Sequence, residues 1–402
     1  MTATALGREA ALAEGSTTAR SHPALWALML LTFSIGVGEF VVLGLLPEVS
    51  ADLGVSVPAA GWLVTGYALG VAIGGPILAV TTMRVPRRTL LGVLGAVFLV
   101  GTIACALAPT YWALMAGRVL ASLAHGAFVG AAVVIATRLV APDREGAAVA
   151  AVIGGFTAAT VVGVPLGTFL GQAFGWRAVF WAIAAVSVAG WLAMMTLLPR
   201  SGKAEPLPDL RREVVALGRP TVLAALATTA LGFGGLFAAY TYIALFLRDV
   251  SGFGAGAIPF LLLVFGIGAV VGNLIGGRLA DRALVPSVMG LLATLAATLV
   301  LLPVLGGSQV MAAALLFVMG GAAFGATPGL QLRVVEEARD APYLSSTMNV
   351  TAFNVGNAAG AFLGGFVIAR TGDVGLAPMA GAALAMLAVL VTWRATRDRA
   401  GP

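Results

Sequence analysis

Charged side chains are scarce in this sequence: they make up 10% of its 402 residues, whereas hydrophobic residues make up 60%. A soluble globular chain carries about 25% charged residues. The mean hydropathy of +1.01 is spread over the whole length rather than confined to one anchor. The chain therefore has too little polar surface for a large domain in water, and the composition predicts an integral membrane protein.

Cysteine is almost absent, since Cys105 is the only one and lies inside an apolar run. This excludes a disulfide framework and a CxxC metal or redox site. The sole lysine, Lys203, is followed by Ala204 and lacks the glycines of a Walker A loop. We therefore expect no metal, no cofactor and no enzymatic activity. Without a nucleotide site, any energy that the protein uses must come from an ion gradient or from a solute's own gradient.

Long apolar runs are what the sequence has in abundance. They lack the alternation of porin strands, which favours helices over a barrel, and the 53 glycines suit closely packed helices. Runs of about 20 residues, enough to cross the hydrocarbon core, predict an all-α fold of twelve transmembrane helices. They begin near Ala24, Ala59, Leu90, Tyr111, Gly146, Arg177, Thr221, Ala257, Pro286, Gln309, Pro342 and Leu376.

The basic residues predict that both termini are cytoplasmic, because cytoplasmic loops retain Lys and Arg. With this orientation Arg177, Arg248 and Arg370 alone lie outside and Arg118 lies in a span, which leaves nineteen of the 23 basic residues inside. The net charge of +6 is then a consequence of topology, and we expect no nucleic-acid partner.

A polar stretch from Arg200 to Pro220 divides the chain into two halves of six helices. Residues 162–171 (VGVPLGTFLG) and 355–364 (VGNAAGAFLG) agree at six of ten positions and occupy equivalent helices, which indicates a parallel repeat. The head of the chain lacks the pattern of a signal peptide. The expected parts are a disordered cytoplasmic tail (1–23), a six-helix bundle (24–199), a cytoplasmic linker (200–220), a second six-helix bundle (221–396) and a tail (397–402).

One loop pattern occurs in both halves. The second half contains Gly277, Leu279, Ala280, Asp281 and Arg282, which resemble the G-x-L-A-D-R-x-G-R-R signature of the major facilitator superfamily. The first copy is degraded, because Met83 replaces the aspartate and Ala79 the leading glycine. It keeps the basic residues Arg84, Arg87 and Arg88.

Two further patterns resemble the twelve-helix drug:proton antiporter branch of that superfamily, which includes sugar-efflux-like and chloramphenicol-efflux-like permeases. Helix four carries Arg118 with Gly126 behind it, similar to the family's R-x7-G pattern. Helix five carries a variant of the antiporter motif G-P-x-x-G-G in which Val164 stands before the proline. The matching residues are Gly163, Pro165, Gly167 and Gly171.

Three ionisable residues lie well inside spans: Glu39, Arg118 and His125. Burying such a group costs at least about 2.5 kcal/mol. Glu39 and Arg118 each lie seven residues, about 10 Å, from the outer end of their helices, so they share one depth. The resemblance implies that helices one and four line a central cavity, where Glu39 would bind a proton or the substrate and Arg118 would tune it. The structural alternative is a fixed ion pair.

His125 is either a proton relay or a histidine hydrogen-bonded to a neighbouring carbonyl. In the second half, rings and amides suit a moderately apolar organic solute. The alternative is that the aromatic rings are packing residues and the asparagines form interhelical hydrogen bonds. The predicted solute-binding residues there are Phe233, Phe237, Tyr240, Tyr242, Asn354 and Asn357.

Together these features predict a multi-pass secondary transporter of a bacterial cytoplasmic membrane. We expect it to export a small organic compound, such as a drug, antibiotic or sugar-like metabolite, in exchange for protons. A monomer would suffice, because one chain holds both bundles. Proton-coupled or facilitated uptake of a sugar or nucleoside is the alternative. A membrane sensor or scaffold is a remote one, for which a soluble signalling domain would be expected.

Overall fold

A computed structural model describes residues 23–141, 144–199, 210–341 and 344–400. The expected N-terminal tail up to residue 22, linker residues 200–209 and the last two residues lie outside the described residues. Within those ranges all regular secondary structure is helical and there is no strand, as the apolar runs predict. Twelve helical segments are long and apolar enough to cross a membrane.

Each of the twelve begins within one helical turn of the position expected from the sequence. The first six are α2 (Pro23–Leu53), α3 (Val57–Thr81), α4 (Arg87–Leu107), α5 (Tyr111–Arg138), a segment made of α6 (Glu145–Ala158), a π-helical turn η2 (Ala159–Gly163) and α7 (Val164–Phe174), and α8 (Trp176–Leu197). The second six are α10 (Pro220–Tyr240) with α11 (Ile243–Asp249), α12 (Ile258–Arg282) preceded by η3 (Ala255–Ala257), α13 (Leu284–Leu305), α14 (Gln309–Glu337), α15 (Leu344–Thr371), and α16 (Ala377–Ala400) preceded by η4 (Val374–Leu376).

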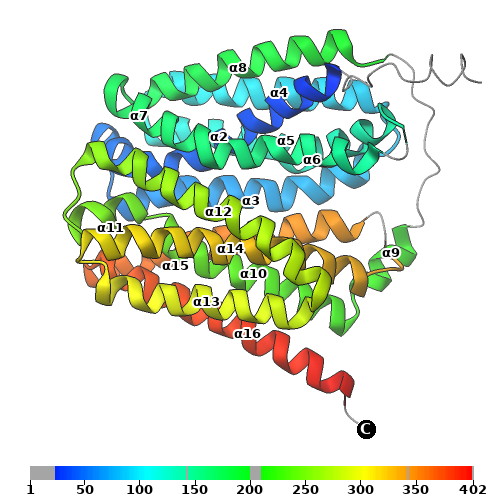
Figure 1. Ribbon diagram of the computed structural model, residues 1–402. Coiled ribbons are helices and arrows are strands. Elements are labelled where there is room, and N and C mark those ends of the chain that lie inside the picture. The colour runs from blue at the N-terminus through cyan, green and yellow to red at the C-terminus, as the bar shows by residue number, and fades with distance from the viewer. Residues whose placement is uncertain (1–22, 142–143, 200–209, 342–343, 401–402) are drawn as a thin grey trace, which may run out of the picture.

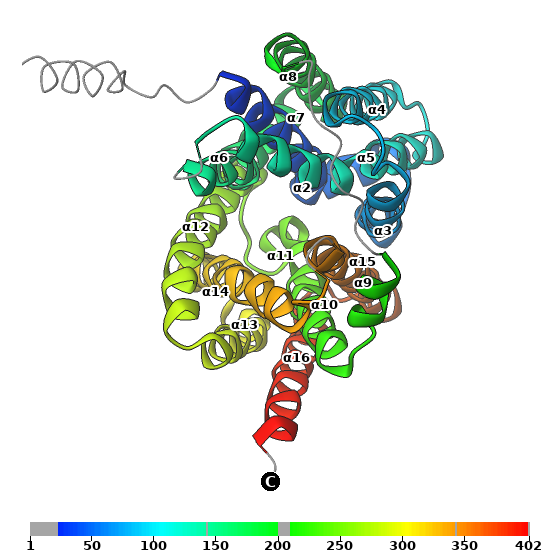
Figure 2. The same cartoon turned by 90° about the vertical axis from the view of Figure 1, so that its right-hand side faces the viewer.

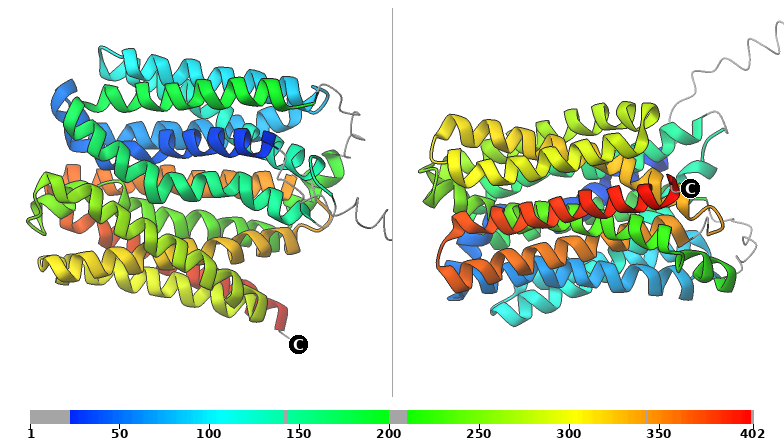
Figure 3. Two further views of the ribbon diagram at one scale, coloured as in Figure 1. Left: turned by 45° about the horizontal axis from the view of Figure 1, so that its top comes forward. Right: turned by 90° about the horizontal axis from the view of Figure 1, so that it is seen from below.

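The helices form two bundles that lie side by side, α2 to α8 and α10 to α16 (Figures 1 and 2). All long helices run roughly parallel to one direction, as the two views of Figure 3 show. We call the end of the molecule that carries α9 (Leu210–Leu217) the linker end, and the opposite end the far end. Between the bundles α3 packs along α15, and α7 and η2 pack against α12.

The repeated glycine segment has the same packing role in both halves. In the first bundle a Cβ on Gly167 would overlap Val41 of α2, and one on Gly171 would overlap Leu45. In the second bundle a Cβ on Gly360 would overlap the Gly234 carbonyl oxygen of α10. Helix five therefore lies against helix one, and helix eleven against helix seven, at distances that only small residues permit.

Two spans are interrupted in ways that the sequence did not indicate. Pro165 has no amide hydrogen, and the helix before it widens into the π-helical turn η2, which accommodates the missing hydrogen bond. The seventh span breaks at Thr241 and Tyr242, where α10 ends and α11 begins. The expected linker also contains a structured part, the helix α9.

The close approach of α15 and α10 predicts that Gly360→Ala destabilises the protein by about 1–3 kcal/mol, because the added methyl meets backbone that cannot move aside. Gly290→Ala on α13 is the matched control, since a Cβ there has open space. Thermal unfolding of both purified variants in detergent measures the difference. Equal unfolding temperatures for the two variants would contradict this packing.

Candidate functional site

Arg118 of α5 is the most deeply buried charged residue among those that the structure describes, with only 1% of its surface exposed. Its Nη1 donates to the Gly38 carbonyl oxygen, its Nη2 to the Glu39 carbonyl oxygen at 3.2 Å, and its Nε to the Leu63 carbonyl oxygen at 3.4 Å. The guanidinium also lies over the Tyr67 ring, 4.3 Å from its centre. One arginine therefore joins α5 to α2 and α3.

These hydrogen bonds confirm that Glu39 and Arg118 lie at the same depth, as their distances from the helix ends predict. Their pairing differs from the fixed ion pair considered as an alternative. The Arg118 donors bond to main-chain oxygen atoms of α2, and among the described residues no ion pair within 4.0 Å joins its guanidinium to the Glu39 carboxylate. The carboxylate is therefore left for other partners.

Those partners come from both bundles. The Glu39 Oε2 lies 3.8 Å from His125 Nδ1, and the Asn357 side chain of α15 lies near the same carboxylate. Glu39 is 7% exposed and His125 is 4% exposed. The buried acid thus lies between an imidazole of the first bundle and an amide of the second.

Tyr67 is a site residue that the sequence reasoning missed. Its hydroxyl lies 3.5 Å from His125 Nδ1, and its ring supports the Arg118 guanidinium. Phe156 of α6 stacks on the other side of the His125 ring, with centres 5.2 Å apart. His125 therefore faces Tyr67 and Glu39 rather than a backbone carbonyl. The available signal was that Tyr67, one of five tyrosines in the chain, lies in the middle of a span.

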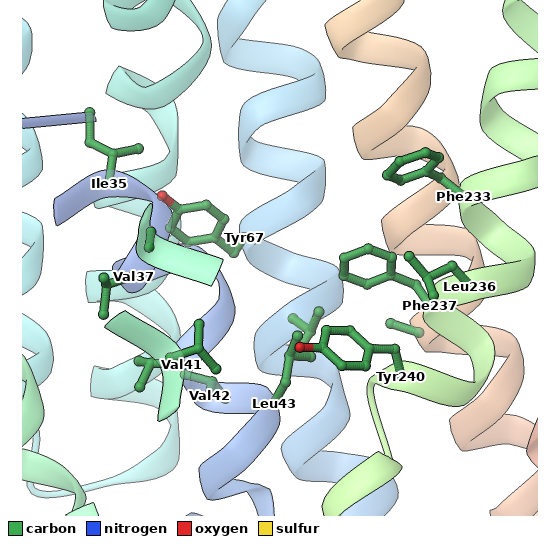
Figure 4. Close-up of a cluster of buried hydrophobic side chains, with 14 of the residues drawn as sticks. Ile35, Val37, Val41, Val42, Leu43, Tyr67, Phe233, Leu236, Phe237 and Tyr240 are labelled. Carbon is green, nitrogen blue, oxygen red and sulfur yellow. The ribbon is translucent and has the colours of Figure 1, made fainter. Parts of the chain in front are cut away.

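Aromatic rings from the second bundle continue this site. Phe237 lies 6.1 Å from Phe40 of α2 and 6.2 Å from Tyr240, measured between ring centres. Tyr240 stacks on Phe265 of α12 at 4.0 Å. Figure 4 shows Phe233, Phe237 and Tyr240 projecting from α10 toward the first bundle. Phe40 and Phe265 also belong to this group of rings, and the sequence contains no motif that would have predicted them.

The asparagines of α15 fall into two classes. Asn349 is fully bonded between helices, because its Oδ1 accepts from Thr229 and its Nδ2 donates to Gln331. Asn354 and Asn357 each have a buried Oδ1 without a hydrogen-bond partner. An unpaired buried acceptor is costly, and the two residues share one helix face at i, i+3.

Tyr242 does not join Tyr240. The break after α10 turns its side chain toward the far end of the α3–α15 contact, where its hydroxyl donates to the Ala361 carbonyl oxygen at 2.9 Å. A Cβ on Gly61 or Gly365 would overlap that hydroxyl. Tyr242 therefore closes the contact between the bundles there instead of facing the Glu39 site.

The loop-signature residues lie at the linker end. Arg88 donates to the Met195 carbonyl oxygen of α8, and Arg84 is exposed. In the second copy Gly277 has open space at its Cβ position, and Asp281 and Arg282 are exposed at the end of α12. In the part of the chain that the structure describes, no amide of α13 hydrogen-bonds to Asp281 in this conformation.

The antiporter-like glycines lie against the helix that carries Glu39. A Cβ on Gly163 would overlap Val37, two residues from Glu39, while Gly167 and Gly171 contact α2 further toward the far end. The motif thus sets how closely α7 approaches α2. No cluster of three metal-ligating side chains occurs among residues 23–141, 144–199, 210–341 and 344–400.

Twelve spans in two bundles, with titratable groups buried where the bundles meet, are the architecture of a secondary transporter. Residues 28–361 match the Major Facilitator Superfamily. The chain belongs to this family, which makes it a membrane transporter and not an enzyme.

Curated relatives extend over nearly the whole chain. The inner membrane transport protein YdhP of Escherichia coli strain K12 is 39% identical over 375 residues, which cover 93% of this chain and 96% of YdhP. A chloramphenicol resistance protein of Streptomyces lividans is 36% identical over 359 residues, covering 87% of this chain and 91% of that protein. These relatives place the protein in a bacterial inner membrane as a multi-pass protein.

Solved structures agree on the fold. A crystal structure of a bacterial homologue of the human lysosomal transporter Spinster, inward-facing and unoccupied, aligns with a TM-score of 0.71. The alignment covers 95% of this chain and 98% of that chain, at 18% sequence identity.

The bonding of Arg118 predicts that its planar guanidinium, and not only its charge, is required. Arg118→Lys keeps the charge but loses the geometry that reaches carbonyls on two helices, so we expect the free energy of unfolding to fall by about 1–3 kcal/mol. Arg339→Lys, an exposed position, is the control. Thermal unfolding in detergent compares the two variants. An Arg118→Lys variant as stable as the control would refute the requirement for the planar guanidinium.

Proposed function

We propose that this transporter exports a small organic compound in exchange for protons, with Glu39 as the proton-binding group. The observation that carries the proposal is the position of the Glu39 carboxylate between His125 and Asn357, without a direct ion pair to Arg118. An acid held in this way is free to gain and lose a proton. An acid locked to an arginine would stay charged.

Arg118 supports the charged form of Glu39 without capturing it. Because three of its N–H groups donate to main-chain oxygen atoms, the guanidinium remains in place when Glu39 is neutral. Its positive charge nearby offsets part of the cost of a carboxylate inside the membrane. His125 lies beside the carboxylate and Tyr67 lies beside His125, and together they provide a short path by which a proton reaches or leaves Glu39.

The solute that fits the surrounding residues has an apolar or aromatic body and hydrogen-bond donors. Phe233, Phe237 and Tyr240 offer ring surfaces. The unpaired Oδ1 atoms of Asn354 and Asn357 accept hydrogen bonds. Since Asn357 also lies near Glu39, a solute that takes over the amide changes the surroundings of the carboxylate. Solute binding and proton release are thereby coupled.

Contacts between the two bundles close the far end, as alternating access requires for one half of the transport cycle. There Tyr242 fits between Gly61 and Gly365, Trp62 meets Phe362 with ring centres 5.2 Å apart, and the bundles are joined by a hydrogen bond from Gln172 to the Ala255 carbonyl oxygen. We infer that the far end is the outer side and that both termini are cytoplasmic. In this conformation the outer side is closed. The other half of the cycle breaks these contacts.

Export is favoured over uptake by the relative named a chloramphenicol resistance protein. Chloramphenicol itself has a ring and hydrogen-bonding groups, and it is therefore the first probe. Proton-coupled uptake of a sugar or nucleoside stays the second candidate because the same carboxylate serves a symporter. The direction of the gradient that drives accumulation distinguishes the two.

The test uses proteoliposomes loaded at one pH and diluted into another. An exchanger accumulates labelled chloramphenicol when the interior is acidic, because protons leave as the solute enters. Glu39→Gln keeps size and hydrogen bonding but does not titrate. We expect this variant to accumulate no more than protein-free liposomes, while it still exchanges labelled for unlabelled solute at equal pH.

Glu145→Gln, an exposed position at the start of α6, is the matched control and should accumulate solute like the unmodified protein. Accumulation only with an alkaline interior would replace exchange by symport. A Glu39→Gln protein that still pumps against a gradient would show that the proton binds elsewhere, with His125 the next group to test.

A further inference from the structure

The short helix α9 at the linker end has a face that no other described element covers. Val214 is 59% exposed and Val215 is 70% exposed. Arg211 precedes them by one turn on the same side, and Arg212 is exposed as well. An amphipathic helix that presents valines flanked by arginines is typical of a segment lying in a membrane interface.

Beside this face lies a basic pocket of about 470 Å³, lined by Arg211, Arg212, Val215, Ala216, Arg219 and Asp340. Asp340 is its only acid, bonded to Arg219 at 2.6 Å and paired with Arg212 at 3.7 Å. Three arginines against one carboxylate leave a surplus of positive charge in a hollow. Such a pocket suits an anionic group with several acceptor oxygen atoms.

The depth of the pocket fits a lipid headgroup. Helix α10 begins at Pro220, directly after Arg219, and α14 ends at Glu337, shortly before Asp340. The pocket therefore lies where two spans leave the hydrocarbon. Helix α9 is held in place below the pocket: Ala216, which also lines the pocket, packs with Val222, Ala338 and Ala341, so the arginines project from a fixed base.

The pocket is also connected to the transport site through α15. The Glu213 carboxylate of α9 accepts a hydrogen bond from the Leu344 amide at 2.8 Å. Leu344 is the first residue of α15, the helix that carries Asn354 and Asn357. One hydrogen bond therefore links α9 to the helix that carries these two asparagines.

We propose that the basic pocket binds the phosphate of an anionic phospholipid from the surrounding leaflet, with Val214 and Val215 inserted beside the acyl chains. The two valines favour a lipid over a water-soluble phosphate, because a soluble anion gains nothing from two exposed aliphatic side chains next to its site.

Native mass spectrometry of the full chain in detergent, titrated with phosphatidylglycerol or phosphatidylcholine, measures occupancy by the first lipid. We expect a preference for phosphatidylglycerol, and Arg211→Gln/Arg212→Gln should weaken its binding about thirtyfold, from the attraction of two basic residues. Arg394→Gln/Arg397→Gln is the control: it removes the same charge from α16 at the same end of the molecule. Val214→Ser/Val215→Ser should also weaken phosphatidylglycerol binding.

Equal weakening by both arginine pairs would overturn the proposal, because the effect would then be one of net charge. So would a serine variant that binds phosphatidylglycerol normally while inorganic phosphate displaces the lipid, which would mark the pocket as a site for a soluble anion. All variants should show the thermal unfolding of the unmodified protein, since the altered side chains are exposed, and a loss of folding would refute the fixed base described for α9.

Discussion

The hydrogen bonds from Arg118 to the carbonyl oxygen atoms of Gly38, Glu39 and Leu63 are the interaction on which the site depends. In hydrocarbon a guanidinium must find acceptors within the protein. The nearest strong acceptor would ordinarily be a carboxylate, but here main-chain oxygen atoms of two neighbouring helices serve instead. The consequence is a fixed positive charge beside an acid that it does not hold in an ion pair. The Glu39 carboxylate then lies between His125 and Asn357.

The membrane also explains which polar groups are structural and which are available. Asn349 satisfies both ends of its amide with Thr229 and Gln331, so it stabilises the second bundle. Asn354 and Asn357, on the same helix, leave one oxygen each without a partner. Glycines hold α15 against α10, and Asn357 of α15 lies near Glu39 of α2. Helix α15 thus combines small residues that allow close packing with two amides that keep an oxygen atom without a partner.

Much of the fold could be predicted from the sequence, because a span needs little more than length and hydrophobicity. The common depth of Glu39 and Arg118 also follows from counting residues along their helices. What the sequence could not specify was side-chain direction. It could not tell whether Arg118 reaches a carboxylate or a carbonyl. It did not separate Tyr240 from Tyr242, because the break between α10 and α11 carries no proline or glycine. Tyr67 was missed because its place in the middle of a span was the available signal and no motif surrounds it.

The central claim is that loading the solute releases the proton held at Glu39. Proton release on binding tests it without a membrane gradient: chloramphenicol is added to the purified protein in weakly buffered detergent, and a pH-sensitive dye records the change. The account predicts acidification that saturates together with solute binding and is absent in Glu39→Gln. Solute binding without acidification in the unmodified protein, or equal acidification in the variant, would contradict it.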